Sequence, residues 1–107
     1  MIKPDTDRHR PYDQMYDDAY SLLVQLCEQQ AALSNAALLD VMDAFNLLAE
    51  YRSPRTLPAR PAQRPIQAMT EAAWLLHKLA DNSDTLADTL LLTRARDLVT
   101  RARDEVS

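Results

Sequence analysis

Hydrophobic and polar residues recur with helical spacing between residues 36 and 51. Four polar residues there lie three, three and four positions apart, which places them in one narrow stripe along a helix: Asp40, Asp43, Asn46 and Glu50. Almost every other position of this segment is apolar. A helix that is apolar around most of its circumference must be covered on several sides. We therefore predict that residues 36–51 form the central helix of a bundle, and that the polar stripe faces solvent.

The same spacing predicts helices on both sides of this segment. Residues 12–32 carry an apolar stripe, and Pro11 followed by several aspartates suits a helix start. Ser34 is a good N-cap and would separate this helix from the central one. The alternative is one continuous helix over 12–51. We favour the continuous helix because neither glycine nor proline interrupts those residues.

The second half of the chain has a clearer division. Residues 52–65 contain four prolines and four arginines, so we expect an extended crossover connection rather than a helix. Pro65 fits the first turn of a helix whose apolar stripe runs to Ala80, and residues 81–84 supply capping side chains and should form a short break. A last helix is expected at about 84–105.

These segments predict a single all-α domain over residues 1–107. Its architecture would be a small bundle of three long or four shorter helices, with a flexible tail at residues 1–10. The chain contains no glycine, which disfavours tight β-hairpins and excludes nucleotide-binding motifs that require glycine. An all-α fold is therefore expected on composition as well as on periodicity.

The net charge of −4 is distributed unevenly. Residues 1–51 carry three cations and nine acids, for −6, whereas residues 52–64 carry four arginines and no acid, for +4. Residues 65–107 carry five cations and seven acids, for −2. An acidic chain is poorly suited to nucleic acid or to an anionic membrane, since both attract a basic face. Only the arginine-rich connection departs from that expectation.

No catalytic or metal-binding pattern is visible. The two histidines, His9 and His77, do not follow a glutamate by three residues, as a carboxylate-bridged metal site in a bundle would require. We interpret Asp40 and Asp43 as solvated residues rather than metal ligands. Cys27 is the only cysteine and is expected to be packed and unreactive. The sequence thus predicts no enzyme, no cofactor and no metal, and without a signal or spanning segment we expect a cytoplasmic protein.

Several residues are candidates for binding a partner. Tyr12, Tyr16 and Tyr20 lie four residues apart on one helix face, where they either flank the core or form a binding strip. Trp74 either completes the core or anchors a partner. Arg55 and Arg60 belong to an Arg-x-x-Pro-x-x-Pro sequence typical of SH3-domain ligands, or to a solubilising connection. We also predict a homodimer interface on the central helix, formed by Leu38, Val41, Met42, Phe45 and Leu48.

These observations favour a non-enzymatic regulator that binds another protein and covers part of its surface. Sequestering a transcription factor, or blocking its dimerisation, would be an example. In size, acidity and helical content the chain is similar to small bacterial antagonist proteins. Two alternatives remain open: a nucleic-acid-associated protein that uses the connecting arginines, and a structural subunit of a larger assembly.

Overall fold

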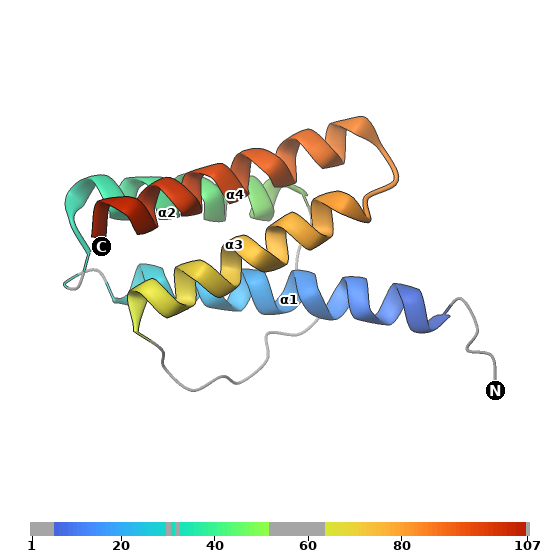
Figure 1. Cartoon of the computed structure of the whole chain (residues 1–107), viewed down its shortest axis with the longest axis horizontal. Helices are drawn as coiled ribbons and strands as arrows, with labels where there is room; N and C mark the ends of the chain where they lie inside the picture. Colours follow the sequence, from blue (N-terminus) through green and yellow to red (C-terminus); the bar gives the residue numbers. More distant parts are fainter. Residues whose placement is uncertain (1–5, 30, 32, 52–63, 107) are drawn as a thin grey trace.

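The described part of the chain folds into four helices and no strand (Figure 1). The structure is a computed structural model that describes residues 6–29, 31, 33–51 and 64–106, with their side chains from Tyr12 onward. The helices are α1 (Thr6–Glu28), α2 (Asn35–Tyr51), α3 (Pro65–Asp81) and α4 (Leu86–Val106). The predicted all-α bundle is confirmed, in its form with four shorter helices.

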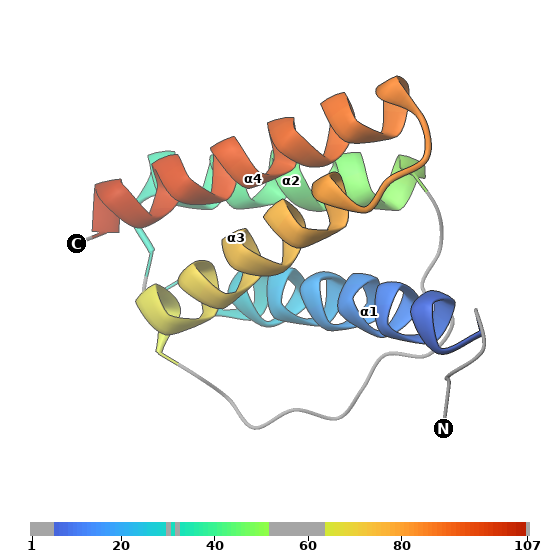
Figure 2. The ribbon, with the colours of Figure 1, turned by 45° about the vertical axis from the view of Figure 1, so that its right-hand side comes forward.

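Each helix packs against two others. α1 and α4 both pack against α2 and α3, and every packed pair is antiparallel (Figures 1 and 2). α2 and α3 run in the same direction, so α2 ends at the opposite end of the bundle from the start of α3. This connectivity is that of bundles with one long crossover. The predicted extended form of that connection lies outside the described residues, except at Arg64, whose backbone is extended.

The continuous helix expected over residues 12–51 is wrong. α1 ends at Glu28, and α2 begins only at Asn35. The Ser34 hydroxyl accepts a hydrogen bond from the Ala37 backbone N–H at 3.1 Å, so this serine caps α2. Leu33, just before the cap, is buried in the core. The capping signal therefore outweighs the helix propensity of the surrounding alanines.

The start of α1 also differs from the prediction. α1 begins at Thr6, six residues before the expected start at residue 12. Residues 6–10, assigned to a flexible tail from the sequence, are therefore helical, whereas residues 1–5 lie outside the described part. Pro11 falls within the first two turns of the helix, where proline is tolerated, and does not mark its start.

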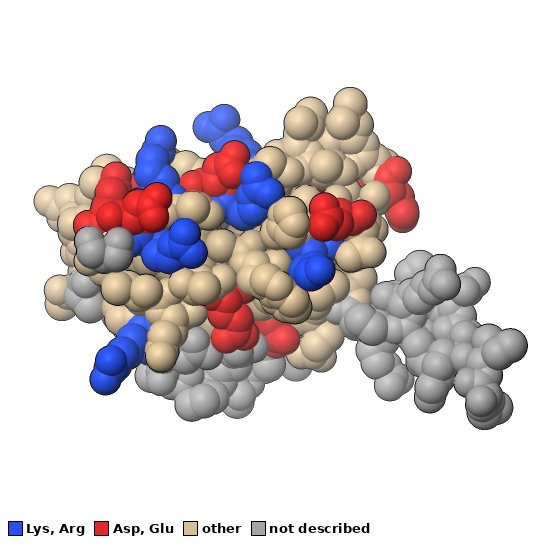
Figure 3. All heavy atoms as spheres, viewed as in Figure 1, with Lys and Arg blue, Asp and Glu red and all other residues tan. Residues whose placement is uncertain are grey.

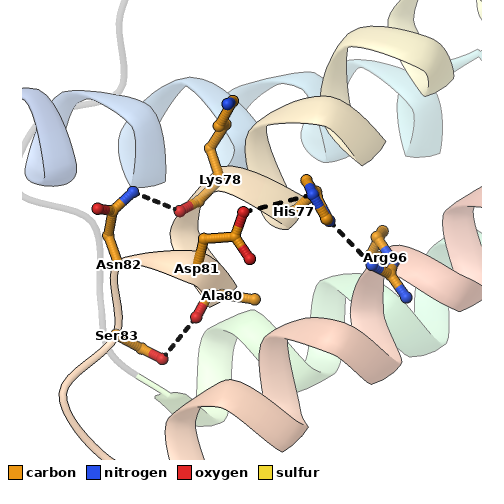
Figure 4. Close-up of polar contacts among 7 residues, drawn as sticks. All are labelled: His77, Lys78, Ala80, Asp81, Asn82, Ser83 and Arg96. Atoms are coloured by element: carbon orange, nitrogen blue, oxygen red, sulfur yellow. Dashed lines mark hydrogen bonds and ion pairs between the residues drawn. The ribbon is translucent and has the colours of Figure 1, made fainter.

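α3 agrees with its prediction, and α4 starts two residues later than expected. Pro65 occupies the start of α3, and residues 82–85 separate it from α4. Asn82 and Ser83 donate side-chain hydrogen bonds to the carbonyls of Lys78 and Ala80 at the end of α3 (Figure 4). No residue of the described part has a positive φ. Many helices end with a glycine in the left-handed conformation. Here side chains satisfy the last carbonyls of the helix instead.

The core runs the length of the bundle and receives side chains from all four helices. Its largest fully buried side chains are mainly leucines, and alanines lie between them where the helices approach closely. The large members are Tyr16, Leu22, Leu23, Leu26, Val41, Leu48, Met69, Leu76, Leu79, Leu92 and Val99. A core of this composition explains why the four amphipathic segments fold together.

Asp40 departs from the solvated stripe predicted for α2. Its carboxylate is buried and accepts two hydrogen bonds from the Arg101 guanidinium of α4, at 2.9 Å from Nε and 2.6 Å from Nη2. α4 packs along this edge of α2 and covers Asp40, whereas Asp43, Asn46 and Glu50 are exposed. These hydrogen bonds and the charge of Asp40 raise the pKa of Arg101. One residue of the predicted stripe, Asp40, thus forms an interhelical ion pair, and the other three face solvent.

Candidate interaction surfaces

Tyr16 belongs to the core and not to a surface strip. It is fully buried, and its hydroxyl donates a hydrogen bond to the Leu48 carbonyl of α2 at 2.5 Å. Its ring centroid lies 5.6 Å from that of Tyr51 and 6.1 Å from that of Tyr20. Because α2 covers this side of α1, Tyr16 presents no surface to a partner.

The other two tyrosines of the predicted strip are partly exposed and also contact α2. The hydroxyls of Tyr12 and Tyr51 are hydrogen-bonded at 3.0 Å. The Tyr20 ring lies 5.1 Å from the Phe45 ring, centroid to centroid. These aromatic contacts join α1 to α2, and a partner-binding role for Tyr12 and Tyr20 stays a prediction.

The residues predicted for a homodimer interface fall into two groups. Val41 and Leu48 are fully buried within the chain's own core, and Leu38 and Phe45 pack against that core while partly exposed. Met42 forms the second group: it is 44% exposed and is not part of the core. The predicted set therefore does not form one free surface, because most of the apolar circumference of α2 is covered by α1 and α4.

A different set of residues forms the solvent-facing side of α2. Leu39 is 61% exposed, although nothing in the sequence distinguishes it from the many other apolar residues of this helix. We define the α2 outer face as the exposed residues Leu39, Met42, Asp43, Asn46 and Glu50. It combines two apolar side chains with two carboxylates.

Trp74 is exposed on α3. It is the only tryptophan of the chain, and 56% of its surface is accessible to solvent. The Lys78 ammonium lies 5.6 Å from the centroid of its ring, within the range of a cation–π interaction. Of the two interpretations left open by the sequence, completion of the core is therefore wrong, and the role of anchor stays a prediction.

His77 lies one helical turn from Trp74 and connects α3 to α4 (Figure 4). Its Nδ1 atom is 2.9 Å from Nη1 of Arg96, and its Nε2 atom is 3.4 Å from the carboxylate of Asp81. A guanidinium can only donate, so Nδ1 accepts and the ring proton of the neutral histidine is on Nε2, facing Asp81. Arg96 also binds the Asp97 carboxylate. We call Trp74, His77, Lys78 and Arg96 the Trp74 surface.

The remaining candidate residues are dispersed. Leu86 and Leu90 are exposed near the start of α4. Arg55 and Arg60 lie outside the described residues, so their predicted role is not addressed by the structure. In Figure 3 lysines and arginines alternate with aspartates and glutamates over the visible face of the described part. That face therefore shows no large area of one charge.

The described residues form no cluster suited to a metal ion. They contain no group of three or more histidine, cysteine, aspartate or glutamate side chains placed to hold a metal ion. Cys27 is partly buried, and burial, with a smaller contribution from Glu28, raises the pKa of its thiol. None of the described helices is both long and apolar enough to cross a membrane.

The raised pKa of Cys27 leads to a testable reactivity. At neutral pH the folded protein should react with a disulfide reagent more slowly than the urea-unfolded chain, because the thiolate is the reactive form and the thiol of Cys27 is partly buried. Because the pKa of Cys27 is higher in the folded than in the unfolded state, the neutral thiol is favoured in the folded state. Its contribution to the free energy of unfolding is complete below the unfolded-state pKa and is lost as pH rises through the folded-state pKa. The reaction rate can be followed by absorbance from pH 7 to 10, and the signal comes from Cys27 alone because the chain has one cysteine. Equal rates in both states would contradict it.

Comparisons of the chain with protein-family models, with curated proteins and with solved structures give no significant match to any of the three.

Proposed function

We propose that this protein is a non-enzymatic regulator that binds a partner protein and acts by covering part of the partner's surface. A transcription regulator kept from its DNA or from its own dimerisation would be such a partner. The observation that carries the proposal is the exposure of Trp74 on a helix whose apolar side is already packed in the core. Tryptophan is among the residues most enriched in binding hot spots.

The neighbours of Trp74 support the same function. α3 is anchored by buried leucines on its opposite side, so the indole is presented from a rigid element. Lys78 lies over the indole ring, and His77, one helical turn from Trp74, contacts Arg96 of α4, so polar groups lie beside the aromatic side chain, as at the rim of a protein–protein interface. In the described residues 12–51 there is no lysine or arginine, which favours a protein partner over nucleic acid.

Replacing Trp74 with alanine tests the proposal. The tagged protein, captured from a lysate of its source organism with and without nuclease, should retain one stoichiometric partner in both conditions by mass spectrometry. Trp74→Ala should weaken binding of that partner about tenfold or more, as expected for a hot-spot residue. Its free energy of unfolding should change by about 1 kcal/mol or less, since the side chain is mostly outside the core.

Leu90→Ala is the matched control, because Leu90 is 61% exposed on a different helix. It should leave the partner bound. A partner that is retained by Trp74→Ala, or recovery that disappears with nuclease, would contradict the proposed function.

A further inference from the structure

The α2 outer face has the geometry of a surface that receives another helix. Leu39, Met42 and Asn46 follow one another at spacings of three and four, so they form one row along α2. Leu39 and Met42 are exposed although the core of this helix is filled by other residues. α2 has 17 residues, and a helix of that length extends about 25 Å, enough for several turns of a partner helix.

The charged residues of α2 itself are all acidic, and Arg101 of α4 lies beside two of them, bound to Asp40 and close enough to Asp43 for that charge to raise the pKa of the arginine. Residues 12–51 contain seven acids and no lysine or arginine. Within α2 the charged residues are Asp40, Asp43 and Glu50, and Asp40 is already paired with Arg101. Asp43 and Glu50 are exposed and lie seven residues apart on one edge of the apolar row. The face is therefore an apolar ridge whose border, as far as α2 supplies it, is acidic at Asp43 and Glu50, with Arg101 of α4 at the Asp40 end.

We propose that the α2 outer face binds a basic amphipathic helix of a partner protein. The apolar residues of that helix would pack on Leu39 and Met42, and its lysines or arginines would lie along Asp43 and Glu50. This inference rests on the proposed function, since both require a protein partner, and it names the chemistry of the partner at a second surface. Charge complementarity of this kind raises association rates and selects among partners.

A second copy of the chain fits the face less well. Two-fold pairing of α2 with α2 of another copy would bring the same surface together twice. Asp43 and Glu50 would then approach the identical acids of the other α2, and α2 contains no cation to balance them. A basic partner avoids that repulsion.

Two synthetic helical peptides provide the test. Both are about 18 residues, or five turns, long and carry leucine at the same helical spacing, but the remaining positions are lysine in one and glutamate in the other. The lysine peptide should bind the full-length protein in a fluorescence anisotropy titration, and the glutamate peptide should not. Binding should weaken as salt increases, because the attraction includes exposed charges.

Substitutions then locate the binding site. The double variant Asp43→Lys, Glu50→Lys should weaken binding of the lysine peptide about tenfold or more. Asp97→Lys, Asp104→Lys is its matched control, because it changes the net charge equally at exposed positions of α4 and should change affinity by about twofold at most. Leu39→Ser, Met42→Ser should also weaken binding, whereas Leu86→Ser, Leu90→Ser should not. Circular dichroism verifies that each variant is folded.

Three results of these solution experiments would overturn the inference. One is failure of the lysine peptide to bind at low salt, and another is an equal loss of affinity in the α4 controls. The third is a dimer in light scattering that Leu39→Ser, Met42→Ser dissociates, since a second copy would then occupy the face. If Trp74→Ala abolishes capture of the natural partner while all α2 variants retain it, the proposed function stands and only this inference fails.

Discussion

Tyr16→Ala is expected to lower the free energy of unfolding by about 3–5 kcal/mol, the range seen when a buried aromatic residue is truncated. Tyr16 is fully enclosed between α1 and α2, where its ring contacts Tyr20 and Tyr51. Its removal leaves a cavity and also deletes the hydrogen bond to the Leu48 carbonyl. Small domains have only about 5–15 kcal/mol of total stability, so the variant should be close to unfolding. Urea denaturation followed by circular dichroism measures the loss.

Two controls separate the contributions at this position. Tyr16→Phe keeps the ring and loses only the hydroxyl, which should cost about 1 kcal/mol. Tyr20→Ala removes an aromatic residue from the same helix face, but Tyr20 is partly exposed and should cost less than Tyr16. An equal loss for Tyr16→Ala and Tyr20→Ala would show that the core does not depend on Tyr16 as described.

The second large effect is expected at the ion pair between α2 and α4. Arg101→Leu should lower the melting temperature by about 5–10 °C, because it leaves the buried Asp40 carboxylate without its partner. Asp40→Leu should have a much smaller effect. It leaves Arg101, whose side chain is 63% exposed, free to turn into water, and it adds an apolar residue to a buried position. Thermal melts followed by circular dichroism measure both variants.

The difference in melting temperature between Arg101→Leu and Asp40→Leu tests whether the buried carboxylate is the source of the destabilisation. The double variant Asp40→Leu, Arg101→Leu should recover most of the stability lost in Arg101→Leu, since no buried charge then remains. If the two single variants are equally destabilised, the cost would lie in the lost attraction between the charges and not in an unpaired buried carboxylate.

Local patterns were sufficient for most of the helices. The bounds of α3 were predicted to within one residue, because Pro65 and the polar residues 81–84 mark its ends, although Asp81 belongs to the helix. Ser34 indicates a break between α1 and α2, which it caps. The surrounding alanines favour a continuous helix, so the two local signals predict different structures. A weak cap signal competing with strong helix propensity cannot be resolved without knowing how the chain packs.

The candidate surfaces could be predicted only in part, since exposure depends on contacts between distant residues. Tyr12, Tyr16 and Tyr20 have the same spacing and chemistry, yet α2 buries only the middle one. Arg101 follows Asp97 by four residues, a spacing that favours an ion pair within one helix, but it binds Asp40, which is 61 residues away. Trp74 had no local feature that distinguished core from surface. In each case the arrangement of the helices decides the outcome.

The single crossover connection has a mechanical consequence. α1 begins at one end of the bundle and α4 ends at the other, so a force applied to the two ends would stretch the domain along its helix axes (Figure 1). α1 and α4 each pack on α2 and α3, so that force would pass from α1 to α4 through those two helices. The helices would then be loaded in shear, with many core contacts strained at once, instead of being peeled apart one turn at a time.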